Sequence, residues 1–278
     1  QRERRRVRLV ALQNDALNMR GALSPMGEAR KVPMPLGESL LPAVEWLIGR
    51  VAELEARPSP ADVLRQASFR LSAQNATHLP PDQGAEVAFA GRSNAGKSSA
   101  LNTITGRKGL ARVSKAPGRT RLINFFTIDD RHSLVDLPGY GYARVARSVR
   151  AEWDEMVGNY LHERESLRGV VLIMDCRHPL TDYDEALLEF CAENSLPVHV
   201  LLSKSDKLSK NERINTLRAV RARLAQHGAG ASAQLFSALS GEGVDEAQAV
   251  VAGWLGITAR SPDKKNPGDK GRESGAFK

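Results

Sequence analysis

Hydrophobic and polar positions alternate regularly over most of the chain. Short apolar runs, typical of buried strands, occur at 86–90, 122–128, 133–137, 169–174, 197–203 and 234–239. Helical periodicity occurs at 97–105, 147–163, 182–194, 209–227 and 243–255. This order predicts an α/β fold with a mostly parallel six-stranded sheet and helices on both of its faces.

The two ends of the chain lack this alternation. Proline and glycine recur through residues 1–62, which we interpret as a mostly flexible N-terminal extension with room for one amphipathic helix at Leu40–Leu54. Residues 63–257 form the predicted folded domain. Residues 258–278, rich in Lys, Asp, Gly and Pro, are predicted to be a disordered basic tail.

The net charge of +8 is concentrated at these ends. Residues 1–8 contain five arginines and one glutamate, a net of +4, and residues 260–278 contain six basic and three acidic residues, a net of +3. Basic ends either bind a polyanion, such as RNA or an anionic membrane surface, or only keep the chain solvated, and the sequence leaves both open. Aromatic residues make up only 5%, which argues against stacking platforms for single-stranded nucleic acid.

The expected compartment is the cytoplasm. Cys176 and Cys191 have neither a metal-ligand nor a CxxC spacing, which favours a reducing environment. No apolar run approaches the length of a membrane span, and the N-terminus lacks the apolar stretch of a secretory signal. We therefore expect no integral membrane contact. The oligomeric state cannot be read from the sequence, but such a domain can act as a monomer.

The strand at 86–90 leads into GRSNAGKSS, residues 91–99, which matches the phosphate-loop pattern G-x-x-x-x-G-K-[ST]. Glycines at 91 and 96 let backbone N–H groups turn around an anion, and the helix beginning at Lys97 directs its positive end to the same place. The Lys97 ammonium would neutralise the β- and γ-phosphates, and the Ser98 hydroxyl would bind Mg²⁺. This motif alone predicts a nucleotide, not which one.

The base preference is predicted from SKSD, residues 203–206, which follows the strand at 197–203. The Asp206 carboxylate can accept both N1–H and the N2 amine of guanine, a pair of donors that adenine lacks. Lys204 can lay its aliphatic stem across the base, and the Ala238 N–H of SAL, residues 237–239, can meet guanine O6. SKSD alone would equally suit a solvated turn, but four motifs after four strands favour one site at the carboxyl edge of the sheet.

Two segments between these motifs have the character of nucleotide switches. DLPG, residues 136–139, ends a strand, so Asp136 would hold Mg²⁺ through water and the Gly139 N–H would face the γ-phosphate. Thr120, in PGRTRLINFF, is the predicted second Mg²⁺ hydroxyl, present only while the γ-phosphate is bound. Loss of that phosphate would release both loops.

The switch region is also the basic part of an otherwise balanced body. Residues 107–121 contain six basic residues and no acidic one, and Arg144, Arg147 and Arg150 follow DLPG. This pattern favours RNA binding under nucleotide control over a merely solvated face or arginines that serve only the phosphates.

Tyr140 stands after Gly139, where many small GTPases have a water-orienting Gln, so intrinsic hydrolysis is expected to be slow or to depend on another group. The Asn94 side chain can help to hold K⁺ beside the phosphates or can simply bond its own loop, and both readings stay open.

GRSNAGKSS, PGRTRLINFF and DLPGYGYA together resemble the EngB/YsxC (YihA) family of ribosome-biogenesis GTP-binding proteins, over Ser68 to Gly256. The resemblance implies a Ras-like P-loop GTPase fold, a role in assembly of the large ribosomal subunit, and contact with its precursor and rRNA. It further implies a link to cell division and septation in some bacteria. The family's usual TKAD is SKSD here, which keeps a hydroxyl at Ser203.

The motifs and the resemblance together give a predicted site. The catalytic candidates are Lys97, Thr120 and Gly139, and the Mg²⁺ ligands are Ser98 and Thr120. The predicted contacts to GTP or GDP are Gly91, Asn94, Ala95, Gly96, Lys97, Ser98, Ser99, Gly118, Thr120, Asp136, Gly139, Ser203, Lys204, Asp206, Ser237, Ala238 and Leu239.

Three alternative functions compete with a GTPase switch. A P-loop ATPase or small-molecule kinase would not need the Asp206 carboxylate. A nucleotide-gated binding module with negligible hydrolysis is compatible with Tyr140. A membrane-associated trafficking GTPase finds no support in a lipidation motif, because the sequence ends in Ala276-Phe277-Lys278.

Overall fold

The computed structural model describes residues 46–49, 57–111, 122–140, 156–226 and 230–257. The chain divides into two compact units, residues 1–51 and 52–278. The first is described only at 46–49, a helical stretch whose Trp46, Leu47 and Ile48 side chains are exposed. Most of the predicted extension, and all of the predicted tail at 258–278, lie outside the described residues.

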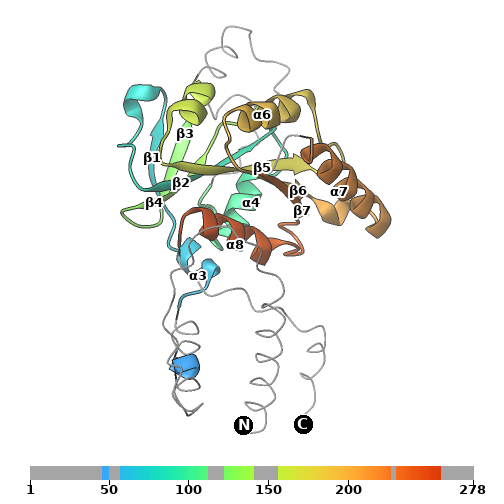
Figure 1. Ribbon diagram of the computed structural model, residues 1–278, viewed down its shortest axis with the longest axis horizontal. Helices are drawn as coiled ribbons and strands as arrows, with labels where there is room; N and C mark the ends of the chain where they lie inside the picture. Colours follow the sequence, from blue (N-terminus) through green and yellow to red (C-terminus); the bar gives the residue numbers. More distant parts are fainter. Residues whose placement is uncertain (1–45, 50–56, 112–121, 141–155, 227–229, 258–278) are drawn as a thin grey trace, which may run out of the picture. The chain divides into compact units, whose positions relative to one another are not determined.

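A seven-stranded sheet forms the centre of the second unit (Figure 1). Its order is β1-β3-β4-β2-β5-β6-β7, with β1 and β3 antiparallel to their neighbours and β4, β2, β5, β6 and β7 parallel to one another. The bounds are β1 Ser68–Ala73, β2 Ala85–Gly91, β3 Ile123–Thr127, β4 His132–Asp136, β5 Leu167–Asp175, β6 Val198–Ser203 and β7 Ala231–Leu235.

The predicted α/β sheet is confirmed, but the prediction of six strands is wrong. The strand that the pattern missed is β1, Ser68–Ala73, which pairs with β3 at the edge of the sheet. Its first three residues are exposed and its register shifts between Phe69 and Leu71, so no continuous apolar run marks it. The last strand ends at Leu235 rather than 239, because the chain leaves β6 after Leu235 and continues as a loop.

Alternate residues of the central strands build two cores. In β5, Val170, Leu172 and Met174 belong to one buried cluster, and Val171 and Ile173 to the other. The strand is therefore buried on both faces, as a parallel strand covered by helices must be. The first core includes apolar residues of α6 (Asp182–Glu193) and α7 (Lys210–Leu224). The second includes those of α3 (Pro60–Leu64), α4 (Lys97–Ile104) and α8 (Val244–Trp254). Figure 1 shows α6 and α8 on opposite sides of the sheet.

Three of the described helices, α3, α6 and α7, begin at residues that satisfy their first N–H groups, whereas α4 and α8 begin after glycines that have no capping side chain. Ser59 and Asp62 form a reciprocal capping box at α3, as do Thr181 and Asp184 at α6 and Ser209 and Glu212 at α7. The bounds are α3 Pro60–Leu64, α4 Lys97–Ile104, α6 Asp182–Glu193, α7 Lys210–Leu224 and α8 Val244–Trp254, with short 3₁₀ turns at Ala76–His78 and Ser205–Lys207. Residues 156–163 are also helical, and the rest of the helix predicted at 147–163 lies outside the described part. Within the described residues, none of the helices is both long and apolar enough to cross a bilayer.

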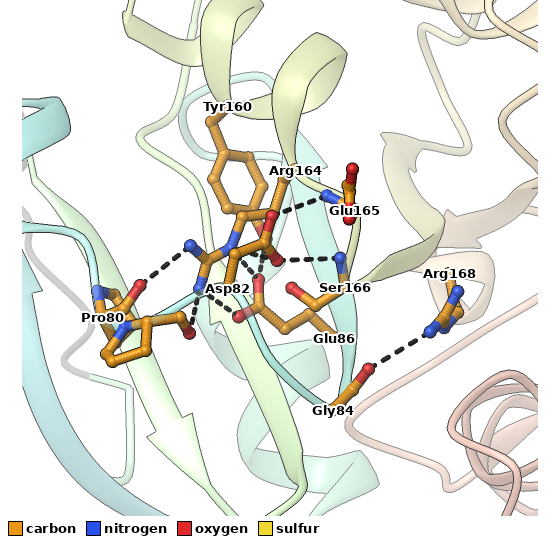
Figure 2. A network of polar contacts seen from close by, with 10 residues as sticks. Pro80, Asp82, Gly84, Glu86, Tyr160, Arg164, Glu165, Ser166 and Arg168 are labelled. Carbon is orange, nitrogen blue, oxygen red and sulfur yellow. Dashed lines mark hydrogen bonds and ion pairs between the residues drawn. The ribbon is translucent and has the colours of Figure 1, made fainter.

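A buried ion pair fixes the amino end of β2 (Figure 2). The Arg164 guanidinium donates to Glu86 Oε1 at 2.6 Å, and the Tyr160 hydroxyl donates to Glu86 Oε2 at 2.9 Å. Arg164 also donates to the carbonyl oxygens of Pro80 and Pro81 at 2.9 and 3.2 Å. The two charged side chains are 6% and 4% exposed, so both have lost most of their hydration. The attraction between them compensates for the free energy that this desolvation costs.

Replacement of Arg164 by Met should therefore lower the free energy of unfolding by about 3–5 kcal/mol, because it leaves the Glu86 carboxylate buried without its cation. Chemical denaturation measures the change. The control is Arg168→Met, which removes an exposed arginine whose bond to the Gly84 carbonyl is 3.2 Å long, and which should cost less than about 1 kcal/mol. Equal losses in the two variants would contradict the assignment.

Candidate functional site

Four strands deliver the predicted motifs to one edge of the sheet. Because β2, β4, β6 and β7 run parallel, their carboxyl ends lie together. The register places Phe89 beside Asp136, and Asp175 beside Ser203. The phosphate-loop pattern, DLPG, SKSD and SAL therefore meet at this edge, as the strand order predicted.

The turn after β2 needs its glycines. A Cβ on Gly91 would lie 2.6 Å from the Ile173 carbonyl oxygen, and Gly96 has a φ of +101° at the residue that caps α4. Asn94 adopts a left-handed φ of +66° between them. The loop thus curls back onto the first turn of α4, where Ser98 and Ser99 are half-buried and free N–H groups and the positive end of the helix favour an anion.

Lys97 and Asp136 face one another across the floor of this loop. The Lys97 ammonium donates to Asp136 Oδ1, and the residues are 9% and 4% exposed. A buried cation and a buried carboxylate at the same point can each find a second partner: an anionic phosphate for the lysine and a hydrated cation for the carboxylate. Of the described ion pairs at this edge, it is the most deeply buried.

DLPG is joined to β2 and to the phosphate loop through the backbone. The Leu137 N–H donates to the Phe89 carbonyl at 3.0 Å, and the Ser93 N–H donates to the Tyr140 carbonyl at 2.9 Å. A Cβ on Gly139 would lie 2.9 Å from Ser93 Oγ, so only glycine fits this approach without displacement. The peptide after Gly139 therefore moves with the phosphate loop or must break from it.

SKSD is tied to the same loop by its first two side chains. The Ser203 hydroxyl donates to the Ala95 carbonyl oxygen. Lys204, with a φ of +58°, donates from Nζ to the Asn94 carbonyl at 2.6 Å and to Asp175 Oδ2 at 2.9 Å. Burial opposes ionisation of Asp175, but hydrogen bonds from Arg177 and Lys204 outweigh it and hold the pKa of this carboxyl well below its usual value.

The third and fourth residues of SKSD contact the loop after β7. The fully buried Ser205 donates to Glu242 Oε2 at 2.6 Å, and Glu242 also pairs with Arg213 at 2.9 Å. The Ser237 hydroxyl donates to Asp206 Oδ1 at 2.6 Å, which lowers the pKa of Asp206 below its usual value.

Ser237 also orders its own loop, because its hydroxyl accepts the N–H groups of Leu239 and Ser240 at 3.2 Å. Ala238 and Leu239 are exposed beside it, and Leu239 is 80% exposed. The Asp206 carboxylate and the SAL loop thus form one rigid, acceptor-bearing corner.

Most predicted site residues are at this edge, with two exceptions. Gly118 and Thr120 lie outside the described residues, as do Arg112, Lys115, Arg119 and Arg121 of the basic loop and the three arginines after DLPG. Among the described residues, no group of three or more His, Cys, Asp or Glu side chains could hold a metal. The oxygen donors beside the loop are the Ser98 hydroxyl and the Asp136 carboxylate, a type of ligand that suits Mg²⁺.

Three residues of this edge were missed by sequence reasoning. Asp175, Arg177 and Asp184 line a cavity of about 230 Å³ together with Asn94 and Lys204. Asp175 could have been found, because it ends a predicted strand at the same edge as the motifs. Asp184 has the T-x-x-D spacing of a capping box, which explains its position but gave no sign of its second contact.

Comparison with known proteins gives relatives over most of this domain. A family model described as "50S ribosome-binding GTPase" matches residues 86–204. The "Probable GTP-binding protein EngB" of Azoarcus sp. (strain BH72) is 55% identical over 194 residues, which cover 69% of this chain and 93% of that protein. The protein of the same name from Coxiella burnetii (strain CbuG_Q212) is 50% identical over 205 residues, 74% of this chain and 98% of that protein.

Among solved structures, a single-residue variant of Aquifex aeolicus Era, bound to GDP and AlF₄⁻, matches with a TM-score of 0.50 and 22% identity. The match covers 62% of this chain and 57% of Era. At this identity the likeness bears on the fold alone.

The Ser237–Asp206 bond predicts a pH-dependent contribution to stability. The pKa of Asp206 is lowered in the folded chain, so this bond stabilises the fold above the ordinary value of 3.8 and is lost as the pH falls through the lower folded value. The difference in unfolding free energy between the wild type and Ser237→Ala should therefore shrink below pH 3.8. Denaturation curves across the acid range measure it. Ser240→Ala, which removes a neighbouring exposed hydroxyl, should show no such pH dependence.

Proposed function

This chain belongs to the EngB family of GTP-binding proteins, and from that premise we propose that it is a slow GTPase that works as a nucleotide switch in assembly of the large ribosomal subunit. The observation that carries the proposal is the convergence of the Lys97–Asp136 pair, DLPG and the Asp206–Ser237 corner at one sheet edge. The P-loop GTPase fold and guanine-nucleotide binding follow from the family.

Guanine is recognised at the Asp206 corner. The hydrogen bond from Ser237 and the low pKa keep Asp206 an ionised acceptor for N1–H and the N2 amine of the base. The stem of Lys204 lies over the base, the Ala238 N–H meets O6, and Leu239 borders the pocket. A purine without the two donors would leave this carboxylate unpaired, which costs binding free energy.

The triphosphate rests on residues Gly91 to Ser99. Backbone N–H groups of Asn94 and Gly96 and of the first turn of α4 surround the phosphates, and Lys97 turns from Asp136 toward them. The Ala95 N–H donates to the Arg92 carbonyl at 3.0 Å and so closes the turn of the loop. When bound, Mg²⁺ supplies positive charge that neutralises the β- and γ-phosphates. Ser98 would hold it directly, Asp136 through water, and Thr120 would add a second hydroxyl. Asn94 is exposed at the loop, where it can also hold K⁺.

The switch responds to the γ-phosphate through the Gly139 N–H. The flanking residues are bonded to β2 at Leu137 and to the phosphate loop at Tyr140, so a γ-phosphate would add a contact to a segment that is already held beside the loop. The Tyr140 side chain is buried and donates to Asp184 at 2.7 Å, so it is not directed at an attacking water. This supports a low intrinsic rate that an ion or the ribosomal partner raises.

The partner is proposed to be the large ribosomal subunit precursor, through its rRNA. The support is the description of the matching family model together with the basic residues around the switches. A cytoplasmic, ribosome-associated monomer with a link to cell division and septation fits this role. The family's guanine preference argues against the ATPase or kinase alternative.

Asp206→Asn should weaken GDP binding by about a hundredfold or more and shift preference toward xanthosine diphosphate, because Asn offers a donor where guanine also has one. Calorimetric titration with both nucleotides measures the change. The matched control is Asp245→Asn, the same substitution at an exposed position in the first turn of α8, which should bind GDP as the wild type does. ATP binding as tight as GTP binding in the wild type would contradict the guanine site.

Co-sedimentation with purified large ribosomal subunits should separate the nucleotide states. The form bound to a non-hydrolysable GTP analogue should sediment with the subunit and the GDP form should remain in the supernatant, since only the γ-phosphate orders both switches. Lys97→Ala, which lacks the phosphate-binding cation, should lose the difference. Association that ignores the nucleotide would overturn the switch.

Single-turnover hydrolysis with and without subunits, in K⁺ and in Na⁺, distinguishes the GTPase switch from a nucleotide-gated binding module with negligible hydrolysis. A switch of the proposed kind hydrolyses GTP slowly alone and faster with the partner or with K⁺. A binding module hydrolyses negligibly under every condition.

A further inference from the structure

Tyr140 is the point where DLPG leaves the phosphate loop and reaches the neighbouring helix. Its backbone pairs with Arg92, and its carbonyl accepts the Ser93 N–H at 2.9 Å. Its ring is 7% exposed and stacks on Tyr183, with centroids 5.9 Å apart and planes at 28°. Burial raises the pKa of the Tyr140 hydroxyl and the Asp184 carboxylate raises it further, so the hydroxyl keeps its proton and donates.

Asp184 accepts the hydrogen bond from Tyr140 and also caps the first turn of α6. Oδ1 accepts from Tyr140 at 2.7 Å, and Oδ2 accepts the Thr181 N–H at 2.9 Å and the Thr181 hydroxyl at 2.8 Å. The residue is 2% exposed. A buried carboxylate with this many donors has one favourable orientation, so it forms a rigid anchor for the tyrosine.

The anchor is connected to the base-recognition side of the site. The chain from β5 to α6 carries Asp175, which accepts from Lys204 at 2.9 Å, and Lys204 in turn donates to the Asn94 carbonyl of the phosphate loop at 2.6 Å. The two ends of one short segment, 175–184, are therefore both connected to the phosphate loop, Asp175 through Lys204 and Asp184 through Tyr140. Asp175, Asp184 and Lys204 all line the cavity of about 230 Å³.

We propose that Asp184 is a positioning residue for the γ-phosphate-sensing peptide, acting through Tyr140. The hydrogen bond fixes the residue that follows Gly139, and so fixes the direction of the Gly139 N–H. This inference rests on the proposed GTP site and adds a residue that none of the four nucleotide motifs contains. It predicts that the bond contributes to binding of the triphosphate and not of the diphosphate.

The test compares affinities of one protein for a non-hydrolysable GTP analogue and for GDP. The base, the ribose and the first two phosphates are common to both ligands. The affinity ratio, defined as the affinity for the GTP analogue divided by the affinity for GDP, therefore isolates contacts to the γ-phosphate. Tyr140→Phe keeps the ring and removes only the hydroxyl. It should lower the ratio about tenfold, which is what the loss of a hydrogen bond to a charged acceptor gives, and should leave GDP affinity within about twofold.

The matched control is Tyr160→Phe at the opposite end of the sheet. Tyr160 is also a buried tyrosine whose hydroxyl donates to a carboxylate, at 2.9 Å to Glu86 (Figure 2). The two variants lose the same group from similar surroundings, so a general loss of stability should be alike in both. Tyr160→Phe should leave the affinity ratio unchanged.

Asp184→Ala tests the other partner, because it removes the carboxylate that accepts from Tyr140. Asp184→Ala should lower the affinity ratio as Tyr140→Phe does, and the double variant should fall no further, because each change breaks the same hydrogen bond. If Asp184→Ala fails to fold, Tyr140→Phe and its control Tyr160→Phe still decide the question.

The outcomes separate this inference from the proposed function. A wild type that binds no guanine nucleotide overturns the GTP site and the inference with it. A wild type that binds both ligands, with an unchanged ratio in Tyr140→Phe, overturns the positioning role alone. An equal fall in Tyr140→Phe and Tyr160→Phe also overturns it, because the effect would then be one of stability.

Discussion

The parallel pairing of β2 with β4 on one side and β5 on the other is the constraint on which the site depends. It places the end of β2 between Asp136 and Ile173, and the close approach of Gly91 to the Ile173 carbonyl leaves no room for a side chain there. The phosphate loop must therefore begin at that point and turn toward α4. Every other group of the site is positioned relative to this turn.

Around the turn, the neighbouring segments are bonded to one another mainly through backbone carbonyl acceptors. The carbonyl oxygens of Asn94 and Ala95 accept from Lys204 and Ser203, and that of Tyr140 accepts from Ser93. The bonds from Lys204 and Ser203 use side-chain donors and so occupy no N–H group of the phosphate loop, whereas the N–H groups of Ser93 and Ala95 donate to the carbonyls of Tyr140 and Arg92. Acidic side chains then lie one layer out, where Asp175 and Asp184 hold the groups that contact the loop. The edge is thus preorganised for a negatively charged ligand, because these two carboxylates bond to neighbouring protein groups.

The sequence was sufficient for the parts of the fold that repeat a local rule. Buried parallel strands such as β5 and β6 are continuous apolar runs, and the motifs after them were placed at the correct edge. It was insufficient for β1, whose pairing with β3 depends on a neighbour about fifty residues away and leaves no local pattern. The Tyr140–Asp184 bond is another such case, because two distant residues meet only after α6 has packed on the sheet.

The serines of SKSD show how a motif can change its letters and keep its chemistry. At position 203 the hydroxyl alone reaches the Ala95 carbonyl, so the methyl group of the threonine common in the family is dispensable. At position 205, where the family commonly has alanine, the added hydroxyl is fully buried but meets Glu242, which Arg213 holds in place. The departure therefore leaves no unsatisfied hydroxyl, because each of the two serines has an acceptor within hydrogen-bond distance.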